Sequence, residues 1–86
     1  MKLIFCKGCQ DVFKLDTEPR TCKCGATSGR YLDDLQAEYK GLWAVPIGFL
    51  NSSLARAVKN QPESGMGEPF MAFTIPKECD TMVKKE

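Results

Sequence analysis

Two close pairs of cysteines constrain the fold of this chain more than any other feature. Cys6 and Cys9 are separated by two residues, Cys22 and Cys24 by one, and twelve residues lie between the pairs. Each pair can present two thiolates from one tight turn, and the intervening span can bring the second turn opposite the first. Four thiolates at Zn–S distances of about 2.3 Å close a tetrahedral site with no position left for water. The spacing therefore predicts a structural Zn²⁺ site with these four cysteines as ligands.

Closely spaced cysteines also serve other chemistries. Iron is an alternative metal, because four thiolates also hold rubredoxin-like iron or an iron–sulfur cluster. A catalytic zinc ion is disfavoured, because four thiolates leave no position for a substrate. A redox-active pair normally opens a helix, and the residues after Cys9 show no helical pattern. The sequence favours structural zinc and leaves iron open.

The length and composition of the chain agree with a metal-stapled domain. Its 86 residues leave room for one domain with a thin core, and domains of this size usually need a staple. The sequence shows neither a signal-peptide pattern nor a run of about 18 apolar residues. We therefore expect a cytoplasmic protein without membrane contact, in which cysteines bind metal and do not form disulfides.

Hydrophobic patterning predicts several short strands. The expected strands cover residues 2–5, 12–15, 30–32, 36–40, 42–45 and 70–75. The continuous apolar run 42–45 predicts burial on both sides, and Pro46 is expected to end regular pairing. Trp43 and Phe73 are expected in the core.

One short helix is expected in the second half of the chain. Leu54, Ala57 and Val58 fall on one helical face, which predicts a helix over residues 52–60. Its start is expected to be capped by one of three polar residues, Asn51, Ser52 or Ser53. Together with the strands, this helix predicts an α+β fold.

Residues 5–25 resemble a zinc ribbon, which is built from two metal-binding turns of the Cys-x-x-Cys-Gly type, called knuckles. Cys24-Gly25 matches this pattern, but Gln10 stands where the first knuckle usually has glycine, and the second knuckle is one residue short. The resemblance covers about a quarter of the chain and implies four cysteine ligands. The later part is similar to short uncharacterised bacterial and phage proteins with such a ribbon, on the basis of residues 51–54, 65–67 and 70–76. No activity is implied by this similarity.

With this resemblance, the expected architecture is an N-terminal zinc ribbon joined to a small, mostly antiparallel sheet with one short helix. We expect a single domain over residues 1–86. Within it, a zinc-ribbon lobe covers residues 1–30, strands and the helix cover 31–80, and residues 81–86 form a frayed tail.

The expected function is a small zinc-stabilised protein-interaction module, an accessory or inhibitory protein of bacterial or phage origin, and not an enzyme. The metal site has no open position, and no histidine is available to activate a nucleophile. The proposed binding surface is the ribbon plus an exposed loop over residues 62–69, and the expected partner is another protein. The sequence makes no prediction about oligomeric state.

A nucleic-acid-binding zinc ribbon is the alternative function. Charge and stacking for such a surface would come from Lys7, Lys14, Arg20, Lys23 and Arg30 with Phe5, Phe13 and Tyr31. The net charge of only +1 and the lack of any Lys/Arg run weigh against it.

The fifth cysteine, Cys79, is expected to be a bystander. Glu78 and Asp80 flank it, and neighbouring acids are expected to raise the pKa of its thiol and lower its reactivity.

Overall fold

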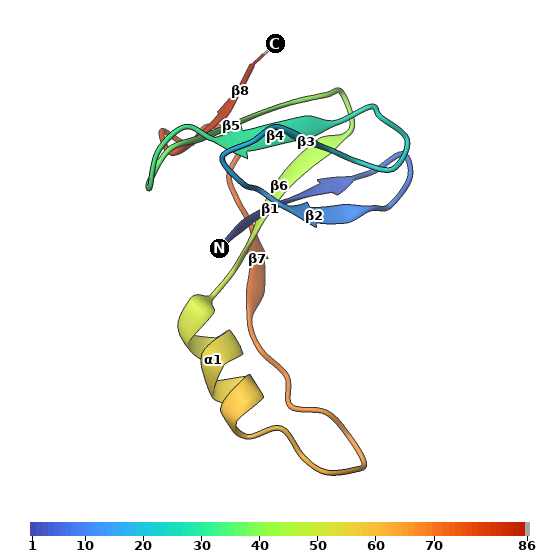
Figure 1. Ribbon diagram of the computed structural model, residues 1–86, viewed down its shortest axis with the longest axis vertical. Coiled ribbons are helices and arrows are strands. Elements are labelled where there is room, and N and C mark those ends of the chain that lie inside the picture. Colours follow the sequence, from blue (N-terminus) through green and yellow to red (C-terminus); the bar gives the residue numbers. More distant parts are fainter. Residues whose placement is uncertain (86) are drawn as a thin grey trace.

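The computed structural model describes residues 1–85, which form two four-stranded sheets and one helix (Figure 1). Sheet A has the strand order β2-β1-β6-β7 and contains β1 (Lys2–Cys6), β2 (Val12–Lys14), β6 (Ala44–Phe49) and β7 (Ala72–Thr74). Sheet B has the order β3-β4-β5-β8 and contains β3 (Arg20–Thr21), β4 (Ser28–Tyr31), β5 (Ala37–Lys40) and β8 (Met82–Lys84). The helix α1 covers Asn51–Lys59. The predicted α+β class is confirmed, with every strand pair antiparallel except β5 with β8.

The strands that carry the cysteine turns belong to different sheets. The first turn joins β1 to β2 in sheet A, and the second joins β3 to β4 in sheet B. β1 also pairs with β6 along its whole length, from Lys2 opposite Gly48 to Cys6 opposite Ala44. The expected boundary after residue 30 falls inside β4. The cysteine region is therefore continuous with both sheets.

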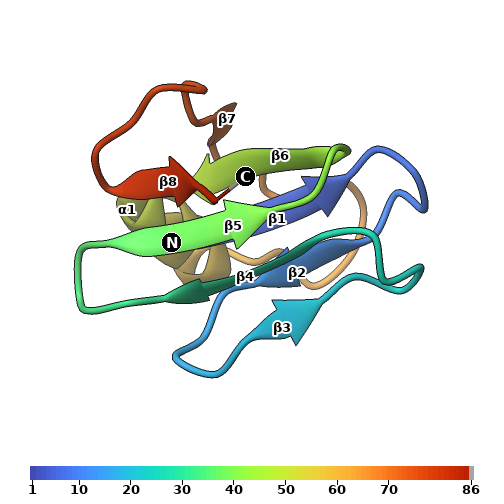
Figure 2. The ribbon, with the colours of Figure 1, turned by 90° about the horizontal axis from the view of Figure 1, so that it is seen from above.

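The core lies between the two sheets, and Figure 2 shows their strands from above, with α1 behind them. Alternation along β1 directs Ile4 and Cys6 inward, where both are fully buried. Leu15, 1% exposed, packs against β4 at Gly29, where an added Cβ would lie 3.0 Å from Leu15 Cδ2 and 2.9 Å from a backbone oxygen of β5. A glycine at this position thus permits Leu15 to pack closely on β4.

The prediction of a frayed tail over residues 81–86 is wrong for its described part, and Glu86 lies outside the described residues. Met82–Lys84 forms β8, which pairs in parallel with β5. Met82 is fully buried in the core, and the Lys2 ammonium donates to the carbonyl of Thr81 at 2.6 Å. The only apolar residues of this strand, Met82 and Val83, are adjacent and give no alternating pattern, so the sequence does not reveal the strand.

The apolar run 42–45 does not form the doubly buried strand expected from it. Leu42 and Trp43 lie in a turn and are 79% and 46% exposed. The strand β6 instead passes through Pro46, contrary to prediction. The carbonyl of Pro46 accepts a hydrogen bond from the Ile75 N–H at 2.9 Å, beyond the end of β7. In a strand, the N–H and C=O of one residue point to the same side. The nitrogen of Pro46, which has no hydrogen to donate, therefore faces the β7 side of β6, at a point beyond the last residue of β7.

The core positions expected for Trp43 and Phe73 are also wrong. Both side chains are about half exposed, at 46% and 50%. Each ring covers a glycine on its inner side: a Cβ on Gly8 would lie 2.3 Å from Trp43, and one on Gly48 would lie 2.7 Å from Phe73. Because glycine has no side chain, the backbone at Gly8 and Gly48 is flat. A large ring can pack one face against it while the other face stays in solvent.

The helix α1 begins one residue earlier than expected and lacks the predicted cap. Its N-cap is Leu50, which makes no side-chain capping hydrogen bond. The Ser53 hydroxyl donates to the Leu50 carbonyl at 2.9 Å and accepts the Met71 N–H at 2.8 Å. Ser53 therefore fastens the helix to the returning chain, and its hydroxyl is not available as a cap.

Figure 1 shows α1 and the chain that follows it extending away from the two sheets. We call residues 50–74 the arm, and the rest of the described chain the body. The last segment of the arm is β7, which pairs with β6 and attaches the arm to sheet A. Within residues 1–85, no helix is long and apolar enough to cross a membrane.

Candidate metal centre

The first cysteine turn is a closed knuckle between β1 and β2. The Gln10 N–H donates to the Cys6 carbonyl at 2.7 Å, and the Cys6 N–H donates to the Asp11 carbonyl at 2.9 Å. Gln10 has a φ of 61°, in the left-handed region that favours glycine. The unusual Gln10 thus keeps the turn geometry of a knuckle while adopting a backbone conformation that is unfavourable for its residue type.

The second cysteine turn repeats this arrangement between β3 and β4. The Gly25 N–H donates to the Cys22 carbonyl at 3.1 Å, and the Cys22 N–H donates to the Thr27 carbonyl at 3.0 Å. Gly25 takes the left-handed position with a φ of 82°. The Cys-x-Cys spacing is one residue shorter than Cys-x-x-Cys, but the turn still closes.

A side chain of the first knuckle holds the second. The Asp11 carboxylate accepts the Lys23 N–H at 3.0 Å. Because Lys23 lies between Cys22 and Cys24, this bond fixes the backbone that presents their two sulfur atoms. Sequence analysis missed this role, since an aspartate in a turn normally bonds its own neighbours.

The structure brings the four predicted ligands together. The sulfur atoms of Cys6, Cys9, Cys22 and Cys24 all lie within 4.8 Å of one another. The Cys24 sulfur lies 3.8 Å from that of Cys6 and 3.5 Å from that of Cys22. A regular tetrahedron with metal–sulfur bonds of about 2.3 Å has edges of about 3.8 Å. The donor set and its spacing therefore fit a four-thiolate metal ion, and these residues are positioned to bind one.

The thiols of the cluster influence one another's ionisation. The Thr27 hydroxyl and backbone N–H beside the Cys22 sulfur lower the pKa of that thiol to about 5, against the effect of its burial. The Ala26 backbone N–H lowers the pKa of Cys24, but the neighbouring Cys22 thiolate and desolvation outweigh it and raise this pKa to about 12. One thiol thus ionises readily and a neighbouring thiol resists ionisation, because several thiolates repel one another when no cation lies between them.

Thr27 provides a second observation that fits a thiolate cluster. Its side chain is 1% exposed, and its hydroxyl lies beside the Cys22 sulfur but does not meet hydrogen-bond geometry with any group in residues 1–85. Its backbone N–H donates to the Cys22 sulfur at 3.4 Å. A thiolate at Cys22 would give the hydroxyl beside it an acceptor as well, as expected of a residue that supports a metal ligand.

Trp43 lies beside the centre, which sequence analysis did not predict. Its carbonyl accepts the Lys7 N–H at 2.9 Å, and its ring covers Gly8 inside the first knuckle. Gly8, inside the turn Cys6-Lys7-Gly8-Cys9, is the sequence feature that could have predicted this contact, because a residue without Cβ leaves room for a ring.

The residues proposed for nucleic-acid stacking and charge are only partly available. Phe13 is buried at 7% exposure, and Phe5 and Tyr31 are half-buried. The Arg20 guanidinium donates to the Lys14 carbonyl at 3.2 Å, and Arg30 pairs with Glu38 at 3.1 Å. Lys7, Lys14 and Lys23 are exposed on the surface. The structure therefore removes Phe13 from any stacking surface and engages two of the five proposed cations.

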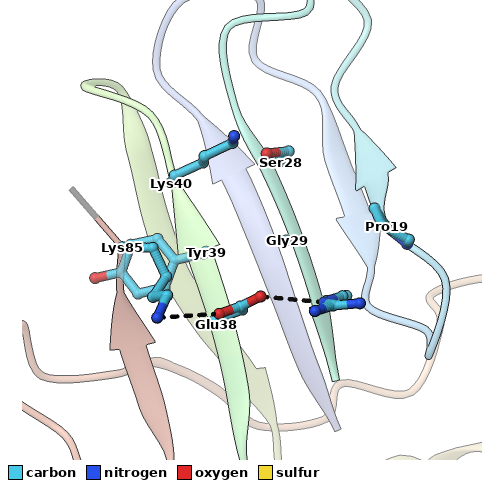
Figure 3. A pocket seen from close by; sticks show the side chains of 8 residues that line it. Pro19, Ser28, Gly29, Glu38, Tyr39, Lys40 and Lys85 are labelled. Atoms are coloured by element: carbon cyan, nitrogen blue, oxygen red, sulfur yellow. Dashed lines mark hydrogen bonds and ion pairs between the residues drawn. The ribbon is translucent and has the colours of Figure 1, made fainter. Parts of the chain in front are cut away.

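A shallow hollow of about 340 Å³ lies over β4 and β5, and Figure 3 shows the side chains that line it. Glu38 accepts from Arg30 at 3.1 Å and lies 3.7 Å from the Lys85 ammonium (Figure 3). Lys40 extends from the same strand as Glu38. The sequence does not predict this group, because Lys85 falls within the expected frayed tail over residues 81–86.

The expected effect on Cys79 is wrong. A hydrogen-bond contact of 3.4 Å between its sulfur and the Thr81 hydroxyl, together with the Thr81 backbone, lowers the pKa of the Cys79 thiol. Glu78 and Asp80 are adjacent in sequence, but the local turn places Thr81 at the sulfur instead.

Comparisons with family models, with curated proteins and with solved structures found no match to this chain.

Proposed function

We propose that this chain is a non-enzymatic protein-interaction module, stapled by one structural Zn²⁺ and binding its partner through the arm. The observation that carries the proposal is the exposure of large apolar side chains on the arm. These side chains are Leu50 (42% exposed), Val58 (64%), Met66 (90%), Phe70 (41%), Met71 (61%) and Phe73 (50%). An apolar surface gathered on one projecting segment is typical of a binding site for another macromolecule. The predicted loop 62–69 is the far part of this surface.

The metal centre supports a structural role in this proposal. Four thiolates fill a tetrahedral site, so a zinc ion held by them has no position for water or substrate. Two of the four cysteines, Cys6 and Cys22, are buried in the core cluster. Zinc is the metal that best suits a closed four-thiolate site without redox chemistry. Elemental analysis of the purified protein should find one zinc ion per chain, and the visible absorbance of an iron–thiolate centre would contradict the assignment.

A pull-down tests the binding role. The tagged full chain is expected to capture one protein in near-equal amount from cells of its source, and nuclease treatment should not release it. The double variant Val58→Asp/Met66→Asp should lose this protein, because it places two carboxylates on the apolar surface. Leu42→Asp is the matched control: Leu42 is 79% exposed but lies on the body, so capture should be unchanged. Equal capture by all three proteins would exclude the arm as the binding surface.

The nucleic-acid alternative has one specific observation in its favour. Three cations, Arg30, Lys40 and Lys85, surround the hollow over β4 and β5 against one carboxylate. This alternative predicts binding that weakens steeply with salt and with the triple substitution of Lys7, Lys23 and Arg30 by alanine. A binding curve that does not respond to salt would exclude it.

A further inference from the structure

We infer that the partner of the arm is the arm of a second copy of this chain, in an antiparallel pair about a two-fold axis. This inference rests on the proposed function, because it requires that the arm be a binding surface. It adds the identity of the partner that the arm binds.

The far part of the arm, residues 58–71, contains only exposed residues. The contacts that hold the arm lie at its base, where β7 pairs with β6, the Leu50 N–H donates to the Met71 carbonyl at 2.9 Å, and the rings of Phe49 and Phe70 meet edge to face at 5.2 Å. Ordering a loop costs about 1–2 kcal/mol per residue in backbone entropy. Burial of the arm against a further surface would offset this cost.

The arm carries a groove and a projecting side chain that complement each other. The groove, about 470 Å³, lies between α1 and the loop. Leu54, Val58 and Phe70 give it an apolar wall, and Glu63 and Glu68 of the loop also line it. Gly65 and Gly67 also line it, but Met66 between them does not, and it is 90% exposed. An unbranched methionine can pack against an irregular apolar wall such as the one formed by Leu54, Val58 and Phe70. Since Met66 leaves the groove of its own arm open, a two-fold pair can place each Met66 in the groove of the other copy.

The charges of the arm are also self-complementary. Arg56 and Lys59 lie on α1, whereas Glu63 and Glu68 lie on the loop. None of these four residues forms an ion pair within the described residues 1–85. An antiparallel pair sets the basic helix of one arm against the acidic loop of the other, twice. The arm has no net charge, so a strongly charged partner surface would not complement it, and the chain's net charge of +1 gives little repulsion between copies.

Sedimentation equilibrium of the zinc-loaded full chain over a range of concentrations tests the inference. The wild type is expected to reach the mass of a dimer. Met66→Asp should raise the dimer dissociation constant by about tenfold or more, because it places a carboxylate against the apolar wall of the groove and beside its two glutamates. The control Leu42→Asp should leave the constant unchanged.

A charge-exchange experiment tests the contact between arms directly. Arg56→Glu/Lys59→Glu makes one arm wholly acidic, and Glu63→Lys/Glu68→Lys makes the other wholly basic. Each variant alone should be monomeric, and an equimolar mixture should form a heterodimer. All four positions are exposed, and zinc content with circular dichroism confirms that each variant is folded.

The inference is overturned if the wild type is a monomer at every concentration, or if its dimer is unaffected by Met66→Asp and by the separate charge variants. A monomer that still captures a different protein through the arm overturns this inference and leaves the proposed function in place. If the wild type is a monomer and also captures no protein, both this inference and the proposed function are excluded.

Discussion

At the residue scale, the two knuckles differ in which residue adopts the left-handed conformation. Gln10 has a φ of 61° in the first turn, and Gly25 has a φ of 82° in the second. A side chain with Cβ is disfavoured in this region by about 1–2 kcal/mol, but glycine gains more entropy on unfolding. The two turns therefore share one geometry but differ in the conformational free energy needed to form them.

Gln10→Gly is expected to raise the free energy of unfolding of the metal-loaded protein by about 0.5–1 kcal/mol, because glycine adopts this φ without a Cβ clash. Gly25→Ala is the matched control with the opposite sign. No atom lies within 4 Å of a Cβ built at Gly25, so only the backbone conformation should lower stability. Denaturant unfolding measures both, and a destabilised Gln10→Gly would show that the Gln10 side chain contributes more than its backbone strain.

Gly8 and Trp43 form the other residue-scale feature of the centre. A Cβ at position 8 would lie 2.3 Å from Trp43 Cε3, so Gly8→Ala should displace the ring and destabilise the protein by about 1–3 kcal/mol. Because Trp43 is the only tryptophan, its fluorescence reports this displacement. Gly67→Ala, where nothing lies within 4 Å, should leave the spectrum unchanged. An unchanged spectrum for Gly8→Ala as well would contradict the contact.

At the element scale, β8 closes the edge of sheet B beside β5. It is only three residues long, but it places Met82 at 0% exposure among the core residues. A short strand with one buried side chain can complete a small core because the neighbouring sheet supplies the remaining contacts.

Met82→Ala is therefore expected to lower the free energy of unfolding by about 2–5 kcal/mol, since it leaves a cavity in the core. Val83→Ala should cost far less, because Val83 points to the other side of the strand and is 42% exposed. Thermal or denaturant unfolding measures both variants. Equal effects would mean that β8 does not contribute a core residue in solution.

At the scale of the whole molecule, the metal centre connects the two sheets. The first knuckle leaves sheet A and the second leaves sheet B, and their four sulfur atoms meet within 4.8 Å. Binding energy at such a site is folding energy, because an unfolded chain does not hold the ligands together. Loss of the metal should thus affect both sheets and not only the first 30 residues.

Chelation of the metal is expected to unfold the whole body in one transition, with loss of strand signal in far-ultraviolet circular dichroism. Cys9→Ser and Cys24→Ser should have the same effect, because each removes one of four ligands. Cys79→Ser is the control, since Cys79 is outside the cluster. A Cys24→Ser variant that stays folded without metal would contradict a structural role for the centre.

The sequence by itself determined the four clustered cysteines and the fold class. Each cysteine pair is presented by a local turn, so the grouping of Cys6 with Cys9 and of Cys22 with Cys24 follows from their spacing. The short helix was also predicted to within one residue, because its periodicity is a local property. These features depend on residues that are close together in the chain.

The tertiary structure decided the features that depend on distant residues. Trp43 is half exposed because Gly8 provides a surface for one face of its ring, and Pro46 can lie within a strand because β7 ends before it. β8 exists because β5 offers a free edge to Met82–Lys84. The arm projects because only its base packs on the body, where β7 pairs with β6 and Phe73 covers Gly48. No local pattern encodes these pairings, since each depends on which surfaces the completed fold brings together.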